Sequence, residues 1–383
     1  MHNYLSKCEM QKDYDVIVVG GRVAGSTTAA FLGKAGVRVL LLERDQLPKT
    51  HPASSPMIQP VTMAMLDEIG ADERAYARAT PPIHTMYGID RDIRWEMPIP
   101  MIEGRDYAYA IDRARFDAAL WENAVRYDSV DGIMRFSVTN ILWDNIGKTV
   151  IGVAGKNLDT GEQQQFAAKV VVGADGRFSM IARKVEAQER DKEEENPTSL
   201  YYAYWRGVAA LDGANGSTSV AYGSNTNTHG YLIMDSADDT TAVVVEGRAD
   251  VIEPLRGETQ SFYLQKLAEN RRVWDRLENA EMVTDVHGMK RIGNMFRQAG
   301  GDGWALVGDA YHQKDPIDGQ GIYDSVYTAR TLAKALNAWL SGETSYDEAI
   351  AWYDEKARKE MDPQYEMTLR RIQQNLYPTM TLP

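Results

Sequence analysis

Cysteine, paired histidines and long apolar runs are all scarce in this chain. Its 383 residues include one cysteine, Cys8, which excludes an internal disulfide and a thiolate metal cluster. The six histidines are scattered without the helical pair of a zinc site, so we expect no metal. No apolar run approaches the roughly 20 residues that a membrane-spanning helix needs. Residues 1–13 are polar and lack the apolar core of a secretory signal, so we expect a cytoplasmic protein.

Positive charge is also in short supply. The 42 lysines and arginines are outnumbered by 55 aspartates and glutamates, which gives a net charge of −13. Such a chain repels a polyphosphate backbone, so nucleic acid is not an expected partner. With 44% apolar and 25% charged residues, the composition is that of a globular protein with one large or two interlocked domains.

The clearest pattern is a strand, turn, helix and strand near the start of the chain. An apolar strand from Tyr14 leads into Gly-Gly-Arg-Val-Ala-Gly at residues 20–25, and a second strand ends at Glu43. In such a unit Gly20 permits the tight turn, Gly25 lets helix and strand approach, and the helix N-terminus faces a pyrophosphate. Glu43 would accept a hydrogen bond from a ribose hydroxyl. The pattern predicts a dinucleotide site, to which we also assign the neighbouring residues Ala24 and Arg44.

Arg22 occupies the place where such turns usually have their middle glycine. One interpretation is that the backbone still approaches the phosphate while the Arg22 side chain turns outward. The other is that the guanidinium itself helps to neutralise the phosphate. The sequence leaves both interpretations open.

The rest of the chain predicts a mixed α/β protein. We expect a short helix at 61–69, an irregular segment to about 109, a helix at 113–127, and a β meander from 149 to 172 that returns to the first sheet. The charged residues 188–196 are interpreted as a solvated loop. Alternating residues at 198–251 predict a second sheet, followed by a long helix at 258–279, a strand and turn at 303–310, and two helices separated near Gly342.

Three further motifs follow in order. Arg113 begins the helix Arg-Ala-Arg-Phe-Asp-Ala-Ala-Leu, Asp175 lies in Gly-Ala-Asp-Gly-Arg-Phe-Ser at 173–179, and Asp309 lies in Gly-Asp-Ala-Tyr-His-Gln-Lys-Asp-Pro-Ile-Asp-Gly-Gln-Gly at 308–321. Together with the opening turn, these motifs resemble the p-hydroxybenzoate hydroxylase-like flavoproteins over nearly the whole chain. That group includes class A aromatic monooxygenases, flavin-dependent halogenases and geranylgeranyl reductase-like enzymes. A branch of it has Gly-x-Arg-x-Ala-Gly at the first turn, so Arg22 looks like a trait of that branch.

The resemblance implies noncovalent FAD and a role for each motif. Arg113 would touch the flavin side of the cofactor, Asp175 and Gly176 would serve FAD and the nicotinamide nucleotide, and Asp309 would accept from ribityl hydroxyls. The helix after the last motif would aim its positive end at the pyrimidine edge, where negative charge accumulates on reduction. The loop residues expected at the isoalloxazine are Pro316, Gly319, Gln320, Gly321 and Ile322. Residues 54–60 resemble a flavin-side loop, in which Gln59 is the best candidate.

The substrate side is harder to interpret. Period-two alternation puts Tyr202, Tyr204 and Arg206 on one face of a strand, which either lines a pocket or fills a core. The reactive group is expected to be the flavin, so Tyr204, Arg206, Gln59 and His312 are only weak catalytic candidates. A histidine in this loop of the family commonly serves structure.

The resemblance implies an FAD-dependent monooxygenase. It would hydroxylate or epoxidise a small aromatic or polyene metabolite with NADPH or NADH and dioxygen, through a flavin hydroperoxide. The alternative is reduction of an unsaturated, isoprenoid-like substrate. Halogenation is disfavoured because the motif Trp-x-Trp-x-Ile-Pro is missing, the nearest string being the one that starts at Trp95. A separate flavin reductase stays possible as a partner, and a non-enzymatic flavin-binding module is the least favoured reading.

The expected architecture is a Rossmann-type FAD-binding domain of three layers, two of β-sheet and one of helices (ββα), interlocked with a smaller mixed-sheet substrate domain and followed by C-terminal helices. The FAD-binding domain would comprise residues 13–82, 110–185 and 285–345. The substrate domain would comprise residues 83–109 and 190–284, and a C-terminal helix would follow at 346–383.

Overall fold

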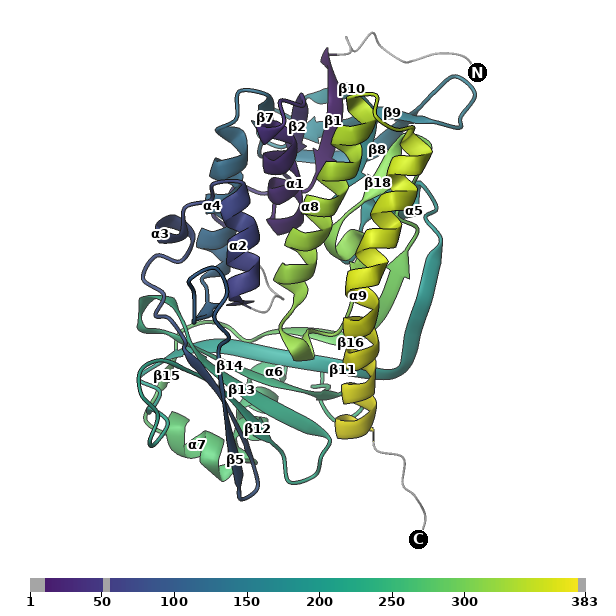
Figure 1. Ribbon diagram of the computed structural model, residues 1–383. Helices are drawn as coiled ribbons and strands as arrows, with labels where there is room; N and C mark the ends of the chain where they lie inside the picture. The colour runs from purple at the N-terminus through teal and green to yellow at the C-terminus, as the bar shows by residue number, and fades with distance from the viewer. Residues whose placement is uncertain (1–10, 51–55, 378–383) are drawn as a thin grey trace.

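The computed structural model describes residues 11–50 and 56–377 and contains two large sheets with helices packed against them (Figure 1). The first sheet and helices α1, α2 and α4 lie in the upper half of Figure 1, and the second sheet lies in the lower half. Helix α9 runs along both halves. This arrangement confirms the α/β fold with a Rossmann-type first part that the sequence predicts.

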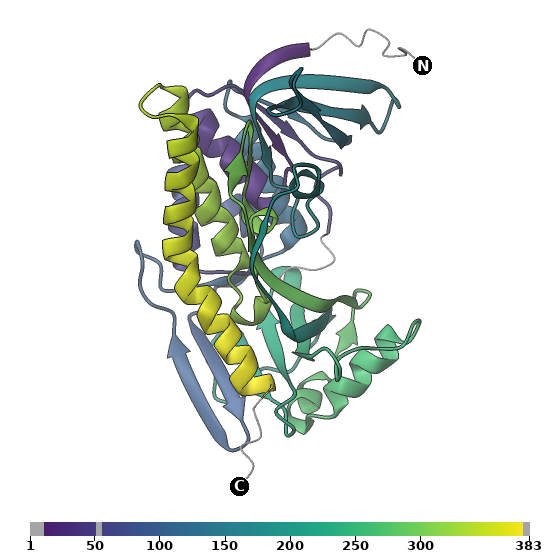
Figure 2. The ribbon, with the colours of Figure 1, turned by 90° about the vertical axis from the view of Figure 1, so that its right-hand side faces the viewer.

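The first sheet is built around parallel strands of buried valine, leucine and isoleucine, as expected where both faces of a sheet are covered. Within the described ranges its main path runs β17-β18-β10-β1-β2-β7, and β9 joins β10 to β8. Helices cover one side of the parallel strands and the β8–β9 ribbon covers the other (Figure 2). The strands are β1 (Gln11–Val19), β2 (Val39–Leu42), β7 (Val130–Ile133), β8 (Phe136–Trp143), β9 (Val150–Asn157), β10 (Gln163–Gly173), β17 (Gly300–Gly301) and β18 (Trp304–Leu306).

The second sheet is mostly antiparallel and runs β19-β16-β11-β14-β13-β12-β4-β5, with β15 beside β11. Its strands are β4 (Thr85–Asp90), β5 (Ile93–Pro98), β11 (Glu189–Arg206), β12 (Thr218–Gly223), β13 (His229–Asp235), β14 (Thr241–Arg248), β15 (Glu281–Met282), β16 (His287–Arg297) and β19 (His312–Gln313). A small pair, β3 (Met57–Ile58) and β6 (Tyr109–Ala110), lies apart from both sheets.

The α-helices are α1 (Val23–Lys34), α2 (Pro60–Glu68), α3 (Glu73–Tyr76), α4 (Arg113–Val125), α5 (Met180–Lys184), α6 (Thr259–Ala268), α7 (Arg271–Leu277), α8 (Gly321–Leu340) and α9 (Tyr346–Leu376). Short 3-10 turns lie at Ala237–Asp239, Gly308–Ala310 and Pro316–Asp318. Helix α1 packs against α4 and α8 over the parallel strands, whereas α6 and α7 close one face of the second sheet. The predicted helix at 258–279 is therefore two helices, because Asn270 accepts from the amides of Arg272 and Val273 and starts α7 anew.

The charged run at 188–196, predicted as a solvated loop, is the first half of strand β11, so that prediction was wrong. Its register against β16 shifts repeatedly before Leu200. Two ion pairs to α9 stabilise this half: Arg190 pairs with Asp354 at 3.1 Å, and Arg358 pairs with Asp191. The strand therefore depends on a helix more than 150 residues away in sequence, which no local pattern could reveal.

The segment expected to be irregular up to residue 109 was also misread, since it contains α3, the β4–β5 hairpin and β6. Strand β4 pairs in parallel with β12, which lies far along the chain. Strand β5 is exposed along its whole length. The hairpin extends the edge of the second sheet, so it depends on pairing with β12, which the local sequence does not reveal.

Candidate functional site

The sequence motifs meet at one edge of the first sheet. Strands β18, β10, β1 and β2 are parallel neighbours, and they end at Leu306, Gly173, Val19 and Leu42. The turns that follow them therefore lie side by side at the carboxyl edge of the sheet. In open α/β sheets this edge is where ligands bind.

The glycines of the first turn allow a very close approach of two backbone segments. Gly20 has φ +104°, and a Cβ there would lie 2.4 Å from the carbonyl oxygen of Ala174. A Cβ on Gly25 would lie 1.7 Å from the carbonyl oxygen of Gly20. Ala24 is buried beside Gly308 of the last motif. Any larger side chain would force these turns apart.

Glu43 connects the end of β2 to the glycine turn. Its side chain is buried and accepts from the backbone N–H of Gly21 at 2.7 Å and of Asp45 at 2.8 Å. Each carboxylate oxygen keeps a second lone pair for a ligand hydroxyl. Arg44, the next residue, is exposed.

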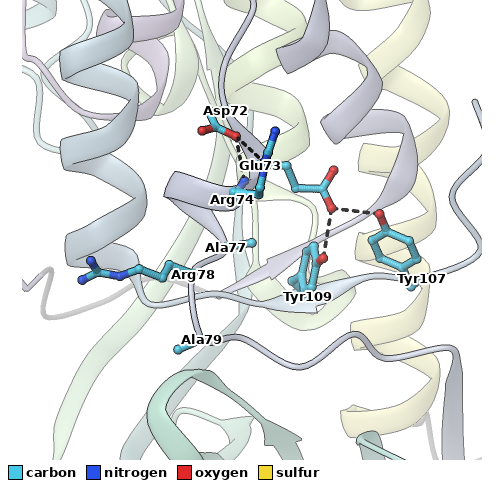
Figure 3. A pocket seen from close by; sticks show the side chains of 8 residues that line it. All are labelled: Asp72, Glu73, Arg74, Ala77, Arg78, Ala79, Tyr107 and Tyr109. Atoms are coloured by element: carbon cyan, nitrogen blue, oxygen red, sulfur yellow. Dashed lines mark hydrogen bonds and ion pairs between the residues drawn. The ribbon is translucent and has the colours of Figure 1, made fainter.

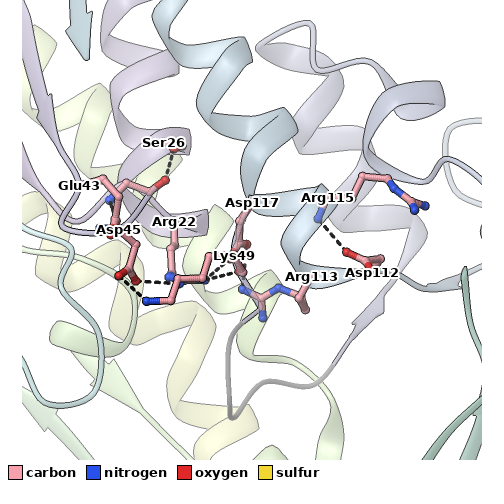
Figure 4. Close-up of polar contacts among 10 residues, drawn as sticks. Arg22, Ser26, Glu43, Asp45, Lys49, Asp112, Arg113, Arg115 and Asp117 are labelled. Carbon is pink, nitrogen blue, oxygen red and sulfur yellow. Dashed lines mark hydrogen bonds and ion pairs between the residues drawn. The ribbon is translucent and has the colours of Figure 1, made fainter. Parts of the chain in front are cut away.

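Arg22 is held in an ion-pair network beside the turn (Figure 4). Its guanidinium contacts Asp117 at 2.9 Å and Asp45 at 3.2 Å, and Arg113 contacts the second oxygen of Asp117 at 3.0 Å. Asp117 is fully buried, so one carboxylate joins two arginines from different elements. The Arg22 side chain is only 20% exposed and does not project into solvent.

Arg113 keeps one donor unused. Asp112 caps α4 through the backbone N–H of Arg115 and so fixes Arg113 in the first turn of the helix. The Arg113 side chain is 9% exposed, and its buried Nε has no hydrogen-bond partner among the described residues. Buried donors are normally bonded. An open glycine turn, two guanidinium groups and an unused donor fit a phosphate-bearing dinucleotide.

Asp175 is turned toward its own chain. It accepts from the hydroxyl of Ser179 and from the backbone N–H groups of Met180 and Ile181, at 2.5 to 3.0 Å. Burial raises the pKa of its carboxyl group. The neighbouring Gly176 has φ +77°, which completes the turn. These contacts fix the Asp-Gly turn in place at the sheet edge.

Arg177, which the sequence did not single out, ties three segments together. It donates to the carbonyl oxygens of Gly293 and Lys314, both at 3.0 Å. Its Nε lies 3.9 Å from the carboxylate of Asp309, whose side chain is 39% exposed. The spacing of two residues from Asp175 was a usable signal, because an arginine there belongs to the same motif.

The last motif forms a half-buried loop ahead of α8. Pro316 begins a 3-10 turn, Gly319 adopts φ +64°, and Gln320 precedes the first residues of the helix, Gly321 and Ile322. Asp318 in this turn accepts from Thr368 and pairs with Arg371, both on α9. Helix α9 therefore holds the loop against the sheet edge.

His312 lies under this loop with the features of a core side chain. Its ring stacks on Phe296 with the centroids 4.1 Å apart and is 1% exposed. Burial, and then the charge of Lys314, lower its pKa well below the ordinary value. The imidazole is therefore neutral at physiological pH.

The two faces of β11 have different surroundings. Tyr201, Ala203 and Trp205 face α6 and α7, whereas Tyr202 and Tyr204 face the opposite side. Burial, followed by Tyr202 and Asp112, raises the pKa of Tyr204, which also lies within the electrostatic reach of Arg113. Tyr204 also packs against the apolar cluster that contains Ala108 and Ala110, which precede α4. Arg206 is exposed at the end of the strand, apart from the two tyrosines.

Gln59 precedes α2 and is half-buried directly after β3. The preceding residues of the predicted flavin-side loop, Ser54 and Ser55, lie outside the described residues, as does Cys8.

Two acidic residues were not identified from the sequence, the half-buried Glu246 and the fully buried Asp315. Glu246 of β14 pairs in register with Leu200, on the same face as Tyr202. It contacts Asp315, which is fully buried and accepts from Thr198 and from the backbone of Ile317. Burial, and then Asp315, raise the pKa of Glu246 well above its ordinary value. An acidic residue at an inward position of an apolar strand was the available signal.

A surface hollow of about 620 Å³ lies elsewhere, beside α3 (Figure 3). Glu73 accepts there from the hydroxyls of Tyr107 and Tyr109 and pairs with Arg105 at 2.8 Å. These polar groups bind one another, and the hollow contains none of the predicted cofactor residues. Separately, no helix within the described ranges has the length and apolar character to cross a membrane.

Comparison with known proteins gives a consistent family. A family model described as an FAD binding domain matches residues 13–362. The 1H-pyrrole-2-carbonyl-(peptidyl-carrier protein) chlorinase of Pseudomonas fluorescens is 25% identical over 349 residues, covering 83% of this chain and 74% of the chlorinase. The digeranylgeranylglycerophospholipid reductase of Methanocella arvoryzae is 26% identical over 373 residues, covering 94% and 87%.

Solved structures share the fold. A myxobacterial chondrochloren halogenase superposes with a TM-score of 0.84 at 24% identity, covering 94% of this chain and 82% of that one. A probable FAD-dependent monooxygenase of Pseudomonas aeruginosa superposes with a TM-score of 0.74 at 18% identity, covering 95% of this chain and 97% of that one. The motif turns at one sheet edge and the match over most of the sequence together place this chain in the FAD binding domain family of flavin-dependent oxidoreductases.

Proposed function

We propose that this chain is an FAD-dependent monooxygenase that hydroxylates or epoxidises a small aromatic or polyene metabolite, with NADPH or NADH as electron donor and dioxygen as co-substrate. FAD, when bound and reduced, supplies the chemistry that activates dioxygen. The observation that carries the proposal is the aromatic wall formed by Tyr202 and Tyr204, which continues into the apolar cluster that contains Ala110, just before α4.

In this proposal the cofactor is held by the motif residues. Arg22 and Arg113 neutralise phosphate charge, Glu43 accepts from the adenosine ribose, and Asp309 accepts from the ribityl chain. The full proposed set is Gly20, Arg22, Ala24, Gly25, Glu43, Arg44, Gln59, Arg113, Asp175, Gly176, Asp309, Pro316, Gly319, Gln320, Gly321 and Ile322. We also retain the division into an FAD-binding part at 13–82, 110–185 and 285–345, a substrate part at 83–109 and 190–284, and a C-terminal helix from 346.

The residues of the chain would bind and orient the substrate and exclude water. Tyr202 is 6% exposed and its ring lies 6.1 Å from that of Tyr204, so the pair offers a dry aromatic surface. Val244 packs against both. A flat, electron-rich substrate fits such a wall, and no protein nucleophile is required.

Reduction of an unsaturated, isoprenoid-like substrate is the second candidate. It is favoured by a continuous apolar cluster that runs from Tyr204 and Val244 to Met86 and Ile99. Aliphatic and methionine side chains of this kind suit a long flexible chain better than a single ring. The similarity to the reductase of Methanocella arvoryzae points the same way.

Halogenation, the activity named for the chlorinase, is the weaker third candidate. The sequence lacks the paired-tryptophan motif, and its nearest counterpart, Trp95, is 46% exposed on the edge strand β5. In that case a separate flavin reductase would supply the electrons.

The test distinguishes these reactions by whether the reduced flavin passes its electrons to dioxygen or to an unsaturated compound. Holoenzyme is reduced anaerobically with NADH or NADPH and mixed with aromatic and polyene compounds, with and without isotopically labelled dioxygen. The proposal expects one labelled oxygen atom in the product and no turnover without dioxygen. Oxidation of the reduced enzyme by an unsaturated compound in the absence of air would establish the reductase instead. Failure of both nucleotides to reduce the flavin would point to a separate reductase.

A further inference from the structure

Lys314 is a buried cation at the start of α8. Its side chain is 3% exposed and lies between β19 and the first turn of the helix. The ammonium group donates to Gln320 at 2.7 Å and to Gln364 at 3.4 Å, and lies 3.2 Å from the carboxylate of Asp324. The charge is thus fully enclosed and fixed by three side chains.

This position is unfavourable for a cation on its own. A helix N-terminus carries a partial positive charge from its unpaired N–H groups, which repels a neighbouring ammonium group. Burying a charged group costs free energy that its counter-ion has to offset. Here Lys314 has one carboxylate partner, Asp324, and two neutral amide partners, Gln320 and Gln364. An anion that approaches this end of α8 would be attracted both by the helix N-terminus and by the Lys314 ammonium group.

The adjacent loop shows where that anion would lie. The residues from Pro316 to Gln320 precede the helix and are half-buried, and Pro316, Gly319 and Gln320 among them are proposed to lie at the isoalloxazine. When a hydride passes from a nicotinamide to bound FAD, two electrons and one proton are gained and the oxidised nucleotide leaves. One negative charge then remains at the pyrimidine edge. That edge is the part of the flavin that the positive end of α8 would meet.

We propose that the Lys314 ammonium, held by Asp324 and Gln320, is the buried charge that stabilises the anionic reduced flavin and raises its reduction potential. Lys314 acts as a positioning charge behind the loop and does not react itself. The inference rests on the proposed function only in that FAD is the bound cofactor.

The other titratable groups around Lys314 support this assignment. His312 is neutral and cannot supply the charge. Burial raises the pKa of Asp324 to about 6, against the lowering effect of Lys314, and Asp309 and Asp318 raise it further. Asp324 is thus a counter-ion whose removal leaves Lys314 uncompensated, so the two residues should have opposite effects on the flavin.

The experiment measures the midpoint potential of bound FAD by equilibration with indicator dyes, together with the dissociation constant of sulfite. Sulfite adds to the oxidised flavin and leaves negative charge on the same pyrimidine edge. Lys314→Met should weaken sulfite binding by about tenfold or more and lower the potential by about 30 mV for each tenfold change. Lys314→Arg should stay within about threefold of the wild type, since it keeps the charge. Lys334→Met, which removes an exposed lysine of the same helix, is the matched control and should change neither value.

Asp324→Asn should change the midpoint potential and the sulfite affinity in the opposite direction, so it still tests the inference if Lys314→Met fails to bind FAD. It should tighten sulfite binding and raise the potential, which a purely structural defect would not do. A Lys314→Met holoenzyme with wild-type potential and sulfite affinity would overturn the inference, as would weaker sulfite binding in Asp324→Asn. A wild-type enzyme that neither nucleotide reduces would refute the NAD(P)H-dependent function, yet the dye-equilibrated potentials would still decide the role of Lys314.

Discussion

The polar groups at the carboxyl edge of the first sheet have different partners from those on the inner face of the second sheet, by which we mean the face of β11 and β14 that carries Tyr202 and Glu246. At the edge, each buried charge has an opposite partner or a backbone donor, as with Asp117 between Arg22 and Arg113 and Glu43 on the glycine turn. On the inner face, Glu246 meets another carboxyl group, Asp315, beside the aromatic ring of Tyr202. The edge fits the anionic dinucleotide that we propose as its ligand. The face is mainly apolar and holds an ionisable pair that favours a bound proton.

The largest effect is expected from breaking the edge at the glycine turn. A Cβ on Gly25 would lie 1.7 Å from the carbonyl oxygen of Gly20. Gly25→Val should destabilise the fold by about 1–3 kcal/mol and reduce the bound flavin to roughly a tenth of the wild-type content or less. Flavin absorbance per protein and thermal unfolding measure this. Gly293→Ala is the control, because nothing lies within 4 Å of its added Cβ. Normal flavin content in Gly25→Val would show that this turn is not part of the cofactor site.

A smaller loss should follow when the charge between the two arginines is removed. Asp117→Asn keeps the shape but leaves Arg22 and Arg113 without their shared carboxylate. We expect FAD affinity to fall by about tenfold, since charge-assisted pairs of this kind orient the guanidinium groups. Titration of apoprotein with FAD by fluorescence quenching measures it. Glu122→Gln, an exposed position on the same helix, should bind FAD like the wild type. If both variants bound FAD equally well, the ion-pair network of Arg22, Asp117 and Arg113 would have no role in FAD binding.

On the inner face, a neutral substitution should stabilise the protein. Glu246 has a raised pKa in the folded state, so its contribution is favourable below its unfolded pKa and is lost as pH rises through the folded pKa. At pH 8, Glu246→Gln should raise the free energy of unfolding by about 1 kcal/mol or more and flatten its pH dependence. Urea unfolding between pH 4 and 8 tests this, with the exposed Glu281→Gln of the same sheet as control. A loss of stability at pH 8 would mean that the Glu246 carboxylate is paired.

The smallest effects are expected on strand β11, where we compare Arg206 at its exposed end with Tyr204 of the aromatic wall. Arg206→Ala removes an exposed side chain and should change stability by less than about 0.5 kcal/mol, with turnover unchanged. Tyr204→Leu removes part of the aromatic wall and should raise KM several-fold with little change in kcat. Steady-state kinetics on an accepted aromatic substrate compares them. A higher KM in Arg206→Ala alone would put the substrate at the open end of β11.

Much of the cofactor region could be predicted because its signals are local. The glycine spacing around Gly25, the apolar strands before each turn and the order of the motifs all lie within short stretches. The strand in the charged run could not be predicted, because ion pairs from α9 to Arg190 and Asp191 stabilise it. The pair of Arg113 and Asp117 could have been predicted, because residues four apart on a helix are neighbours. The partners of Lys314 could not be predicted, since Gln320 lies in the loop before α8, Asp324 on α8 and Gln364 on α9.

The sequence by itself determined that this chain has an α/β fold of the flavoprotein kind, because backbone turns that require glycine leave a mark at fixed positions. Only the tertiary structure decided which face of β11 carries the aromatic wall, how the Arg22 guanidinium is held, that Glu246 meets Asp315, and that Lys314 is buried. Those features depend on side chains that meet across sheets and helices from distant parts of the chain. The sequence therefore shows which residue types are present, whereas the partners and the burial of each side chain are determined only by tertiary packing.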